Sequence, residues 1–245
     1  MARLANADDE VLSASLNQST QHIMQGDQAA AEEILVTLVP ALKERMGATH
    51  EATLIARMNQ GIVLKNTGQL FEALAVQRSV VADWESTAPR GDHRVYLTAR
   101  HALGMVQLEL GELDGLVDEF REIYEAERDV LGAGDPDTLN SLFAVAMTLS
   151  AERNLEEAEE AFLECHSEML AHLGPHHAKT LGAVTGLAQV LRALGKHGDA
   201  LAWLDLADRG VRENYGDVHA FRAILLSVRG TTLYDMGRPE KAEEA

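Results

Sequence analysis

Apolar residues recur along most of the chain at spacings of three and four positions, separated by polar ones. In residues 53–67, TLIARMNQGIVLKNT, the spacing is carried by Leu54, Met58 and Ile62. Side chains three or four positions apart share one face of an α-helix. Aromatic residues make up only 4% of the chain, whereas strands are enriched in aromatic and β-branched residues. The pattern therefore predicts an all-helical protein.

A loop-like sequence interrupts the helical pattern at regular intervals. LGAGDPDTLN begins at Leu131 and LGPHHAKTLG begins at Leu173, 42 residues later. Comparable stretches begin at Met46, Pro89 and Tyr215. A fixed period of this length indicates a repeat architecture, in which each unit buries its apolar face against its neighbours.

Three further columns keep the same register. The first holds a small residue, the second a glycine seven positions later, and the third an apolar residue five positions after that. The columns are Ser19, Gly61, Gly104, Ala146, Ala188 and Gly230; Gly26, Gly68, Gly111, Arg153, Gly195 and Gly237; and Ala31, Ala73, Leu116, Ala158, Ala200 and Ala242. Glycine closes a helix in the left-handed conformation at little cost. At the exception, Arg153, we expect the neighbouring Asn154 to take that conformation, which asparagine tolerates best after glycine.

Each unit is thus predicted to be a hairpin of two helices, with the glycine between them and small residues where helices approach. Six hairpins fit, the last incomplete, in a single domain spanning residues 1–245. Their approximate ranges are 7–46, 50–88, 93–131, 135–173, 177–215 and 219–245.

A small residue, a glycine and an alanine at these spacings resemble the tetratricopeptide repeat. The longer period and the loop pattern LG-x-x-H/D-P-x-T resemble the subtype found in kinesin light chains and many bacterial proteins. The resemblance covers nearly the whole chain and implies a right-handed superhelical solenoid of helical hairpins. Peptide-binding members of the subtype carry asparagines on the first helix of each hairpin. The matching positions here are Asn59, Ala102, Ala144, Gly186 and Val228, so only Asn59 agrees.

The resemblance also implies that the first helices line a concave groove, which solenoids use for binding. The residues expected to face it are apolar and rich in methionine in the first four units, and more polar in the last two. They are Leu16, Ile23, Met24, Ile55, Met58, Asn59, Ile62, Lys65, Asn66, His101, Met105, Leu108, Asn140, Phe143, Met147, Gln189, Arg192 and Tyr234. A groove of this kind suits an amphipathic helix or an apolar peptide. The alternative is that these side chains pack between adjacent hairpins.

The loops carry a column of polar residues at the start of each first helix: His50, His93, Asp135, His177 and His219. A polar side chain there can accept hydrogen bonds from free backbone N–H groups, and Pro136 strengthens the start signal. We therefore expect caps rather than metal ligands in this column.

Two other groups of residues also suggest chemistry. His166, Glu168, His172 and His176 lie near one another in sequence, and i, i+4 spacing suits a metal site, although a solvated helix end explains it as well. Cys165 shares its column with Leu38, Val80, Ile123 and Ala207. We therefore expect Cys165 to be a core residue rather than a nucleophile.

The net charge and the absence of long apolar runs limit the expected partners and the expected location of the protein. The formal net charge of −18 disfavours nucleic acids and anionic membranes and favours an apolar or basic partner. No apolar run is long enough to span a bilayer, and no signal peptide is recognisable. One cysteine is compatible with a reducing compartment, so a cytoplasmic protein is expected.

The leading hypothesis is a non-enzymatic scaffold without a cofactor, binding a protein or peptide partner in the groove. The alternatives are a peptide- or small-ligand-sensing domain of a bacterial regulator, and an enzyme or metal-binding protein on a helical solenoid. The incomplete last hairpin, GRPEKAEEA, adds the hypothesis that the chain self-associates there or continues a longer array.

Overall fold

The computed structural model describes residues 8–87, 94–215 and 220–237. These residues form eleven α-helices and no strand, which confirms the predicted all-helical class. The chain divides into two compact units, Met1–Glu112 and Leu113–Ala245.

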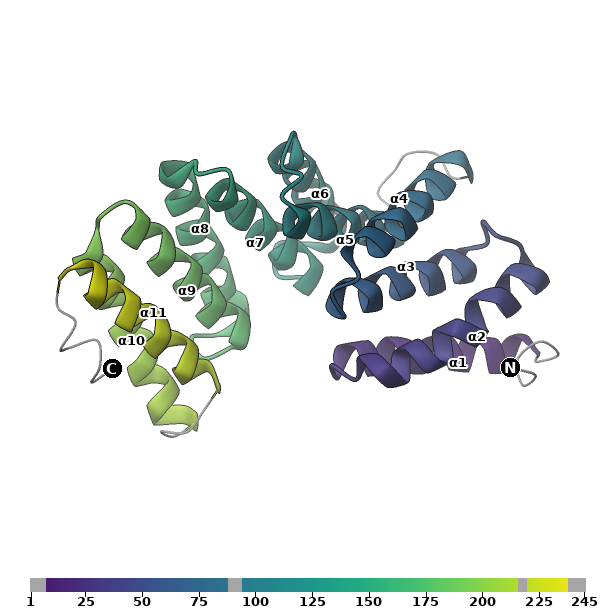
Figure 1. Ribbon diagram of the computed structural model, residues 1–245, viewed down its shortest axis with the longest axis horizontal. Helices are drawn as coiled ribbons and strands as arrows, with labels where there is room; N and C mark the ends of the chain where they lie inside the picture. Colours follow the sequence, from purple (N-terminus) through teal and green to yellow (C-terminus); the bar gives the residue numbers. More distant parts are fainter. Residues whose placement is uncertain (1–7, 88–93, 216–219, 238–245) are drawn as a thin grey trace. The chain divides into compact units, whose positions relative to one another are not determined.

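The first unit contains α1 to α5, and each helix packs on the next along the chain (Figure 1). The first helices of successive hairpins also touch, α1 with α3 and α3 with α5. Their bounds are Asp9–Met24 for α1, Gln28–Met46 for α2, Glu51–Asn66 for α3, Leu70–Thr87 for α4 and Arg94–Leu110 for α5.

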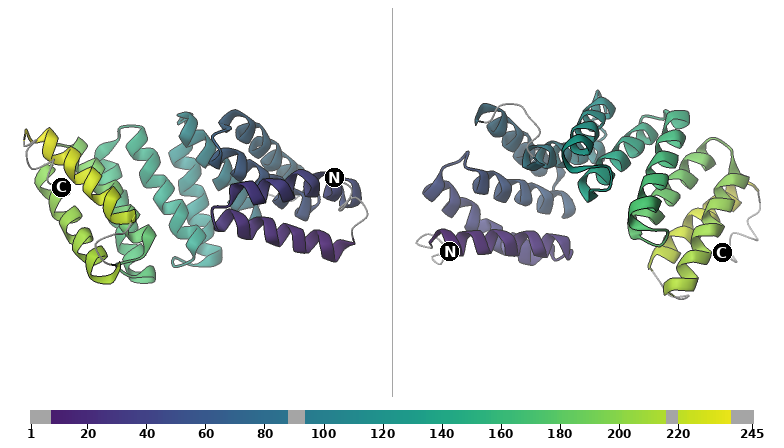
Figure 2. Two further views of the ribbon diagram at one scale, coloured as in Figure 1. Left: turned by 60° about the horizontal axis from the view of Figure 1, so that its bottom comes forward. Right: turned by 180° about the vertical axis from the view of Figure 1, so that it is seen from behind.

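The second unit contains α6 to α11, again with consecutive helices side by side (Figure 2). Here α7 touches α9, and α9 touches α11. Their bounds are Leu116–Leu131 for α6, Pro136–Ala151 for α7, Leu155–Leu173 for α8, Ala178–Ala193 for α9, His197–Tyr215 for α10 and Ala220–Asp235 for α11. No helix among the described residues is both long and apolar enough to cross a membrane.

The helices match the predicted hairpins closely, since every predicted range begins within a few residues of an observed first helix. The single domain over residues 1–245 stays a prediction. The last hairpin is described only through α11, and residues 238–245, on which the self-association hypothesis rests, lie outside the described part.

The recurring columns explain the packing of the hairpins. Ala31, Ala73, Ala158 and Ala200 are fully buried, and Leu116 is 3% exposed. In the small column, a Cβ on Gly61 would lie 2.6 Å from Nε2 of Gln77, on the neighbouring helix. A larger side chain at Gly61 would therefore displace Gln77.

The glycine column closes the first helices as predicted. Gly26, Gly68, Gly111, Gly195 and Gly237 all have positive φ. The prediction for the exception is wrong, because the left-handed residue is Arg153 itself, at φ 65°, while Asn154 has φ −80° and precedes α8. The closing hydrogen bond from the Asn154 N–H to the Leu149 carbonyl, 3.0 Å, fixes which residue must be left-handed, whatever its side chain.

The loop column forms helix caps as predicted. Nδ1 of His50 and of His177 accept hydrogen bonds from the backbone N–H of Ala52 and Lys179, at 3.3 and 3.2 Å. Oδ1 of Asp135 accepts from the N–H of Asp137 at 2.9 Å, and Pro136 opens α7. His93 and His219 lie outside the described residues.

Candidate functional site

A groove of about 400 Å³ lies in the second unit among the first helices of three successive hairpins. Its lining is mostly apolar, with a few polar groups from α9. The lining residues are Phe143, Met147, Ser150 and Ala151 of α7, Phe162 of α8, Gly182, Thr185, Gly186 and Gln189 of α9, and Phe221 and Ile224 of α11.

Two phenylalanines and a glycine form one wall of this groove. The rings of Phe143 and Phe162 meet edge to face with centroids 5.8 Å apart. A Cβ on Gly186 would lie 2.3 Å from Cε1 of Phe162, so the ring reaches the groove only because position 186 has no side chain. Ile224 is 47% exposed, which leaves apolar surface at the rim.

Three of the predicted groove residues meet here: Phe143, Met147 and Gln189. Arg192 of α9 donates to Oδ2 of Asp235 on α11 at 2.7 Å, so its charge joins two first helices. Tyr234 is 69% exposed. Asn140 is half-buried on α7 and is not among the groove residues.

Two predicted residues of the first unit are not available to a partner. Met58 is 7% exposed and packs in a core with Leu54, Val80 and Trp84. Asn59 is 4% exposed, and its Nδ2 donates to Oγ1 of Thr20 at 2.9 Å. Both side chains join neighbouring hairpins, which is the alternative that the sequence left open.

Of the remaining predicted residues of the first unit, some pack against the hydrophobic cores and others lie at the surface. Leu16 and Ile23 pack against the core of the first hairpin, and Ile55 and Ile62 against that of the second. His101, Met105 and Leu108 are half-buried on α5, and Asn66 is exposed. Nζ of Lys65 pairs with Oε1 of Glu109 at 2.9 Å. Met24 is 84% exposed.

Of the five positions in the asparagine column, only Asn59 carries an amide, and its side chain is bonded within the chain. Asn59 is bonded to Thr20, and the space above Gly186 is filled by Phe162. Ala102 and Ala144 are buried and carry no amide.

The histidine and glutamate cluster does not converge. Nε2 of His172 lies 3.5 Å from Oε2 of Glu168 at the helix surface, whereas the ring of His166 packs against Trp203 of α10, with centroids 4.9 Å apart. In the part of the chain that is described, no three His, Cys, Asp or Glu side chains are placed to hold a metal ion.

Cys165 is a core residue, as predicted. It is fully buried, and its Sγ lies 3.7 Å from Sδ of Met169. Burial raises the pKa of the Cys165 thiol to about 12, so the thiolate needed by a nucleophile is absent near neutral pH.

Sequence reasoning missed Phe162, Phe221 and Ile224. Phe221 and Ile224 lie three positions apart on α11, the helix that also carries the predicted Tyr234. Phe162 lies on a second helix and reaches the groove only past Gly186. No pattern within α8 shows that.

Comparison with known proteins supports the fold. The sequence profile of the tetratricopeptide repeat family matches residues 173–245. Among curated proteins, no sequence matches the chain significantly. The solved structures include a putative kinesin light chain from Podosopora anserina with nearly identical TPR-like repeats. It has a TM-score of 0.70 and 19% identity, over 89% of this chain and all of that one.

Two solved complexes also match, one with a cognate peptide and one with Competence and Sporulation Factor. NprR with its cognate peptide NprX has a TM-score of 0.70 at 13% identity, over 97% of this chain and 66% of that one. A Rap protein complexed with Competence and Sporulation Factor has a TM-score of 0.68 at 12% identity, over 94% of this chain and 71% of that one. At these identities the likeness establishes the fold. The helical-hairpin fold that the resemblance to tetratricopeptide repeats implied is confirmed.

Proposed function

We propose that the protein is a non-enzymatic interaction scaffold, and that the groove among α7, α9 and α11 binds the apolar face of a partner peptide or amphipathic helix. The observation that carries the proposal is the groove itself, about 400 Å³ in volume. Its apolar side chains come from three hairpins, and Ile224 leaves apolar surface at the rim. Burying such surface drives association.

The groove favours a partner that brings apolar side chains at helical spacing. Met147 is flexible and polarizable and adapts to apolar partners of different shapes. Gln189 is exposed at the groove and offers an amide for one polar contact. The net charge of −18 favours basic residues on the solvent side of the partner.

A second candidate is a sensing domain for a short peptide or small ligand. The volume of the groove lies in the range of small-ligand sites, and two structural neighbours were solved in complex with a cognate peptide and with Competence and Sporulation Factor. A cytoplasmic location belongs to either proposal, and it is supported by the free, buried Cys165.

The test is affinity capture from native extract with the parent chain and the Met147→Glu/Ile224→Glu variant. Both changes place charge in the groove, and neither residue is buried in the core. Val36→Glu, at an exposed position of α2, is the matched control, and circular dichroism checks the helices. A partner held by the parent and the control but lost by the variant supports the proposal; equal capture by all three contradicts it.

A further inference from the structure

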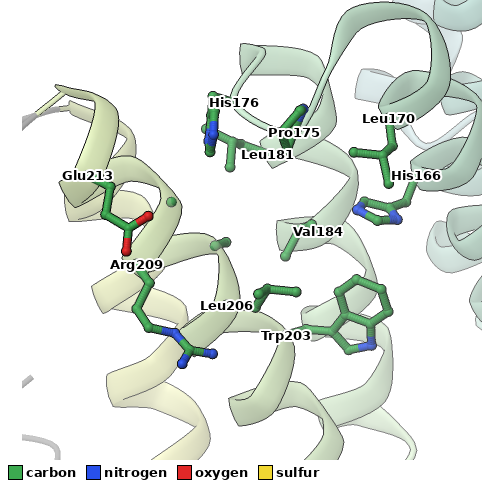
Figure 3. A pocket seen from close by; sticks show the side chains of 12 residues that line it. His166, Leu170, Pro175, His176, Leu181, Val184, Trp203, Leu206, Arg209 and Glu213 are labelled. Carbon is green, nitrogen blue, oxygen red and sulfur yellow. The ribbon is translucent and has the colours of Figure 1, made fainter.

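The second unit has another hollow, between the second helices of its last two complete hairpins. It has a volume of about 510 Å³. His166 and Leu170 of α8 form one wall, and Trp203 and Leu206 of α10 form the other (Figure 3). Leu181 and Val184 of α9 lie between them. The groove proposed above shares none of these residues.

The preceding repeat shows that packing does not require an apolar surface here. A smaller hollow, about 350 Å³, lies at the equivalent place between α6 and α8 and is lined by Tyr124, Arg128, Ala161 and Glu164. The equivalent positions of the next repeat, 42 residues later, hold His166, Leu170, Trp203 and Leu206. An arginine and a glutamate are thus replaced by two leucines that remain 41% and 57% exposed.

Exposed leucines are common singly, but here they line one cavity together with a tryptophan. Apolar surface gathered in a hollow marks binding sites more often than scattered exposure does. Burial lowers the pKa of the His166 imidazole, which favours its neutral form in that wall. The hollow fits a large aliphatic or aromatic side chain.

Charge beside the hollow indicates what accompanies that side chain. On the other flank of α8, Glu160 and Glu164 line the smaller hollow. No residue in the described ranges forms an ion pair with either, whereas Glu157 pairs with Arg121 at 3.1 Å. At the mouth of the larger hollow, Arg209 and Glu213 carry opposite charges. Arg121 and Arg128 also line the smaller hollow, together with Glu125 and Glu157, so four glutamates face two arginines there and the charge beside the larger hollow is negative on balance.

The larger hollow and the pair Glu160 and Glu164 lie close enough for one short peptide segment to contact both. They flank a single helix, whose diameter with side chains is about 10–12 Å. An extended chain covers that distance in about four residues at 3.3–3.6 Å each. The chain's own residues 238–245, RPEKAEEA, contain no large apolar side chain and would not fill the hollow.

We propose that the hollow between α8 and α10 binds a large apolar side chain of a second protein. That protein's segment also carries lysine or arginine, which contacts Glu160 and Glu164. The site is a second interaction surface, separate from the groove on the first helices. It allows one chain to join two partners.

Trp203 makes the proposal measurable, because the only other tryptophan is Trp84, which is 6% exposed in the first unit. The full chain is titrated with the peptide acetyl-GLLAKRK-amide while tryptophan fluorescence is recorded. Acetyl-GLLAEDE-amide and acetyl-GAAAKRK-amide are the matched controls. We expect a saturable signal with the first peptide, weakened by salt, and affinity at least about tenfold lower for each control.

The variants separate the apolar and the charged contribution. Leu170→Arg/Leu206→Glu installs the residues of the preceding repeat, so we expect the fold to be kept and affinity to fall about tenfold. Leu206→Ala, at an exposed position, should lower the affinity for the peptide by a smaller factor. Glu160→Gln/Glu164→Gln should weaken binding several-fold and reduce its salt dependence. Val36→Glu should leave binding unchanged, because Val36 is exposed on α2 and lies in neither the groove nor the hollow.

Three outcomes would overturn the proposal. They are the absence of a fluorescence change up to millimolar peptide, equal binding of the glutamate-containing peptide, and unchanged affinity in the Leu170→Arg/Leu206→Glu variant. Loss of capture in the groove variant of the preceding section would leave this result unaffected, so the two proposals fail independently.

Discussion

Arg153 holds a backbone conformation that glycine holds at the equivalent position of the other repeats. Its φ is 65°, and its exposed side chain forms no hydrogen bond or ion pair with any residue described. A non-glycine residue in the left-handed region costs about 1 kcal/mol relative to glycine. The turn before α8 is therefore strained, and the Arg153 side chain makes no contact that offsets this cost.

Arg153→Gly should raise the free energy of unfolding by about 0.5–1 kcal/mol. The measurement is urea unfolding followed by circular dichroism. Gly195→Arg, the reverse change one repeat later, is the matched control and should destabilise by a similar amount. A lower stability of Arg153→Gly than of the parent would contradict this account of the turn.

Cys165 should be unreactive in the folded protein. Burial raises the pKa of the thiol to about 12, so the thiolate fraction at pH 8 is far below that of a free cysteine, whose pKa is about 8.5. A disulfide-exchange reagent added at pH 8 should label the thiol only after guanidinium is added. Labelling within seconds in buffer alone would show that the thiol is accessible and would reopen a catalytic role.

Single residues also show the limit of reading a sequence. Met58 and Phe143 occupy the same position of two repeats, and both were predicted to face the groove. Met58 is buried with Trp84 and Val80, whereas Phe143 is half-buried and lines the groove. Side chains of neighbouring helices decide which of the two residues is buried. The repeat position that Met58 and Phe143 share therefore does not predict their burial.

Helix starts were predictable because capping is local. The polar column places an acceptor two residues before the N–H that it satisfies, and three of its five members are described and do so. Helix ends were predictable for the same reason, through the glycines. Only the prediction that Asn154 takes the left-handed conformation was wrong, because a backbone hydrogen bond places that conformation at Arg153.

The capping role of His177 can be separated from any other role by two substitutions. His177→Ala should lower the free energy of unfolding by about 0.5–1 kcal/mol, because the N–H of Lys179 loses its acceptor. His177→Asp should recover or exceed the parent, since aspartate caps well and favours the helix N-terminus. Thermal unfolding reports both. Equal damage by alanine and aspartate would mean that the imidazole itself is needed.

The contact between α8 and α9 depends on the missing side chain at position 186. Gly186→Ala places a Cβ 2.3 Å from the Phe162 ring and should destabilise by about 1–3 kcal/mol through overpacking. Phe162→Leu should relieve the clash. In a double-mutant cycle monitored by urea unfolding, the two changes together should cost less than their sum. Simple additivity would show that Phe162 is not what Gly186 accommodates.

The charge of the entire chain should make its stability depend on salt. With 39 acidic and 21 basic residues, self-repulsion opposes the folded state, and the screening length falls to about 10 Å at 0.1 M salt. The Tm should rise by about 2–4 °C between 10 and 200 mM sodium chloride. Differential scanning fluorimetry measures it, and a fall in Tm would mean that ion pairs such as Lys65–Glu109 outweigh the repulsion.

The repeat period carried most of what could be known of the fold, because each hairpin repeats the same local requirements. The period alone could not tell which of the equivalent grooves is open, or that Leu170 and Leu206 line one hollow together with Trp203. These properties depend on side chains from three or more helices at once.

The most direct test of the scaffold proposal is photo-crosslinking from within the groove. The photoreactive residue p-benzoylphenylalanine replaces Met147 in one variant and Val36, on an exposed face of α2, in another. Both are irradiated in native cells. The account predicts a discrete adduct to a partner segment from position 147 and none from position 36. Adducts only from position 36, or none from position 147 while capture by the parent succeeds, would contradict it.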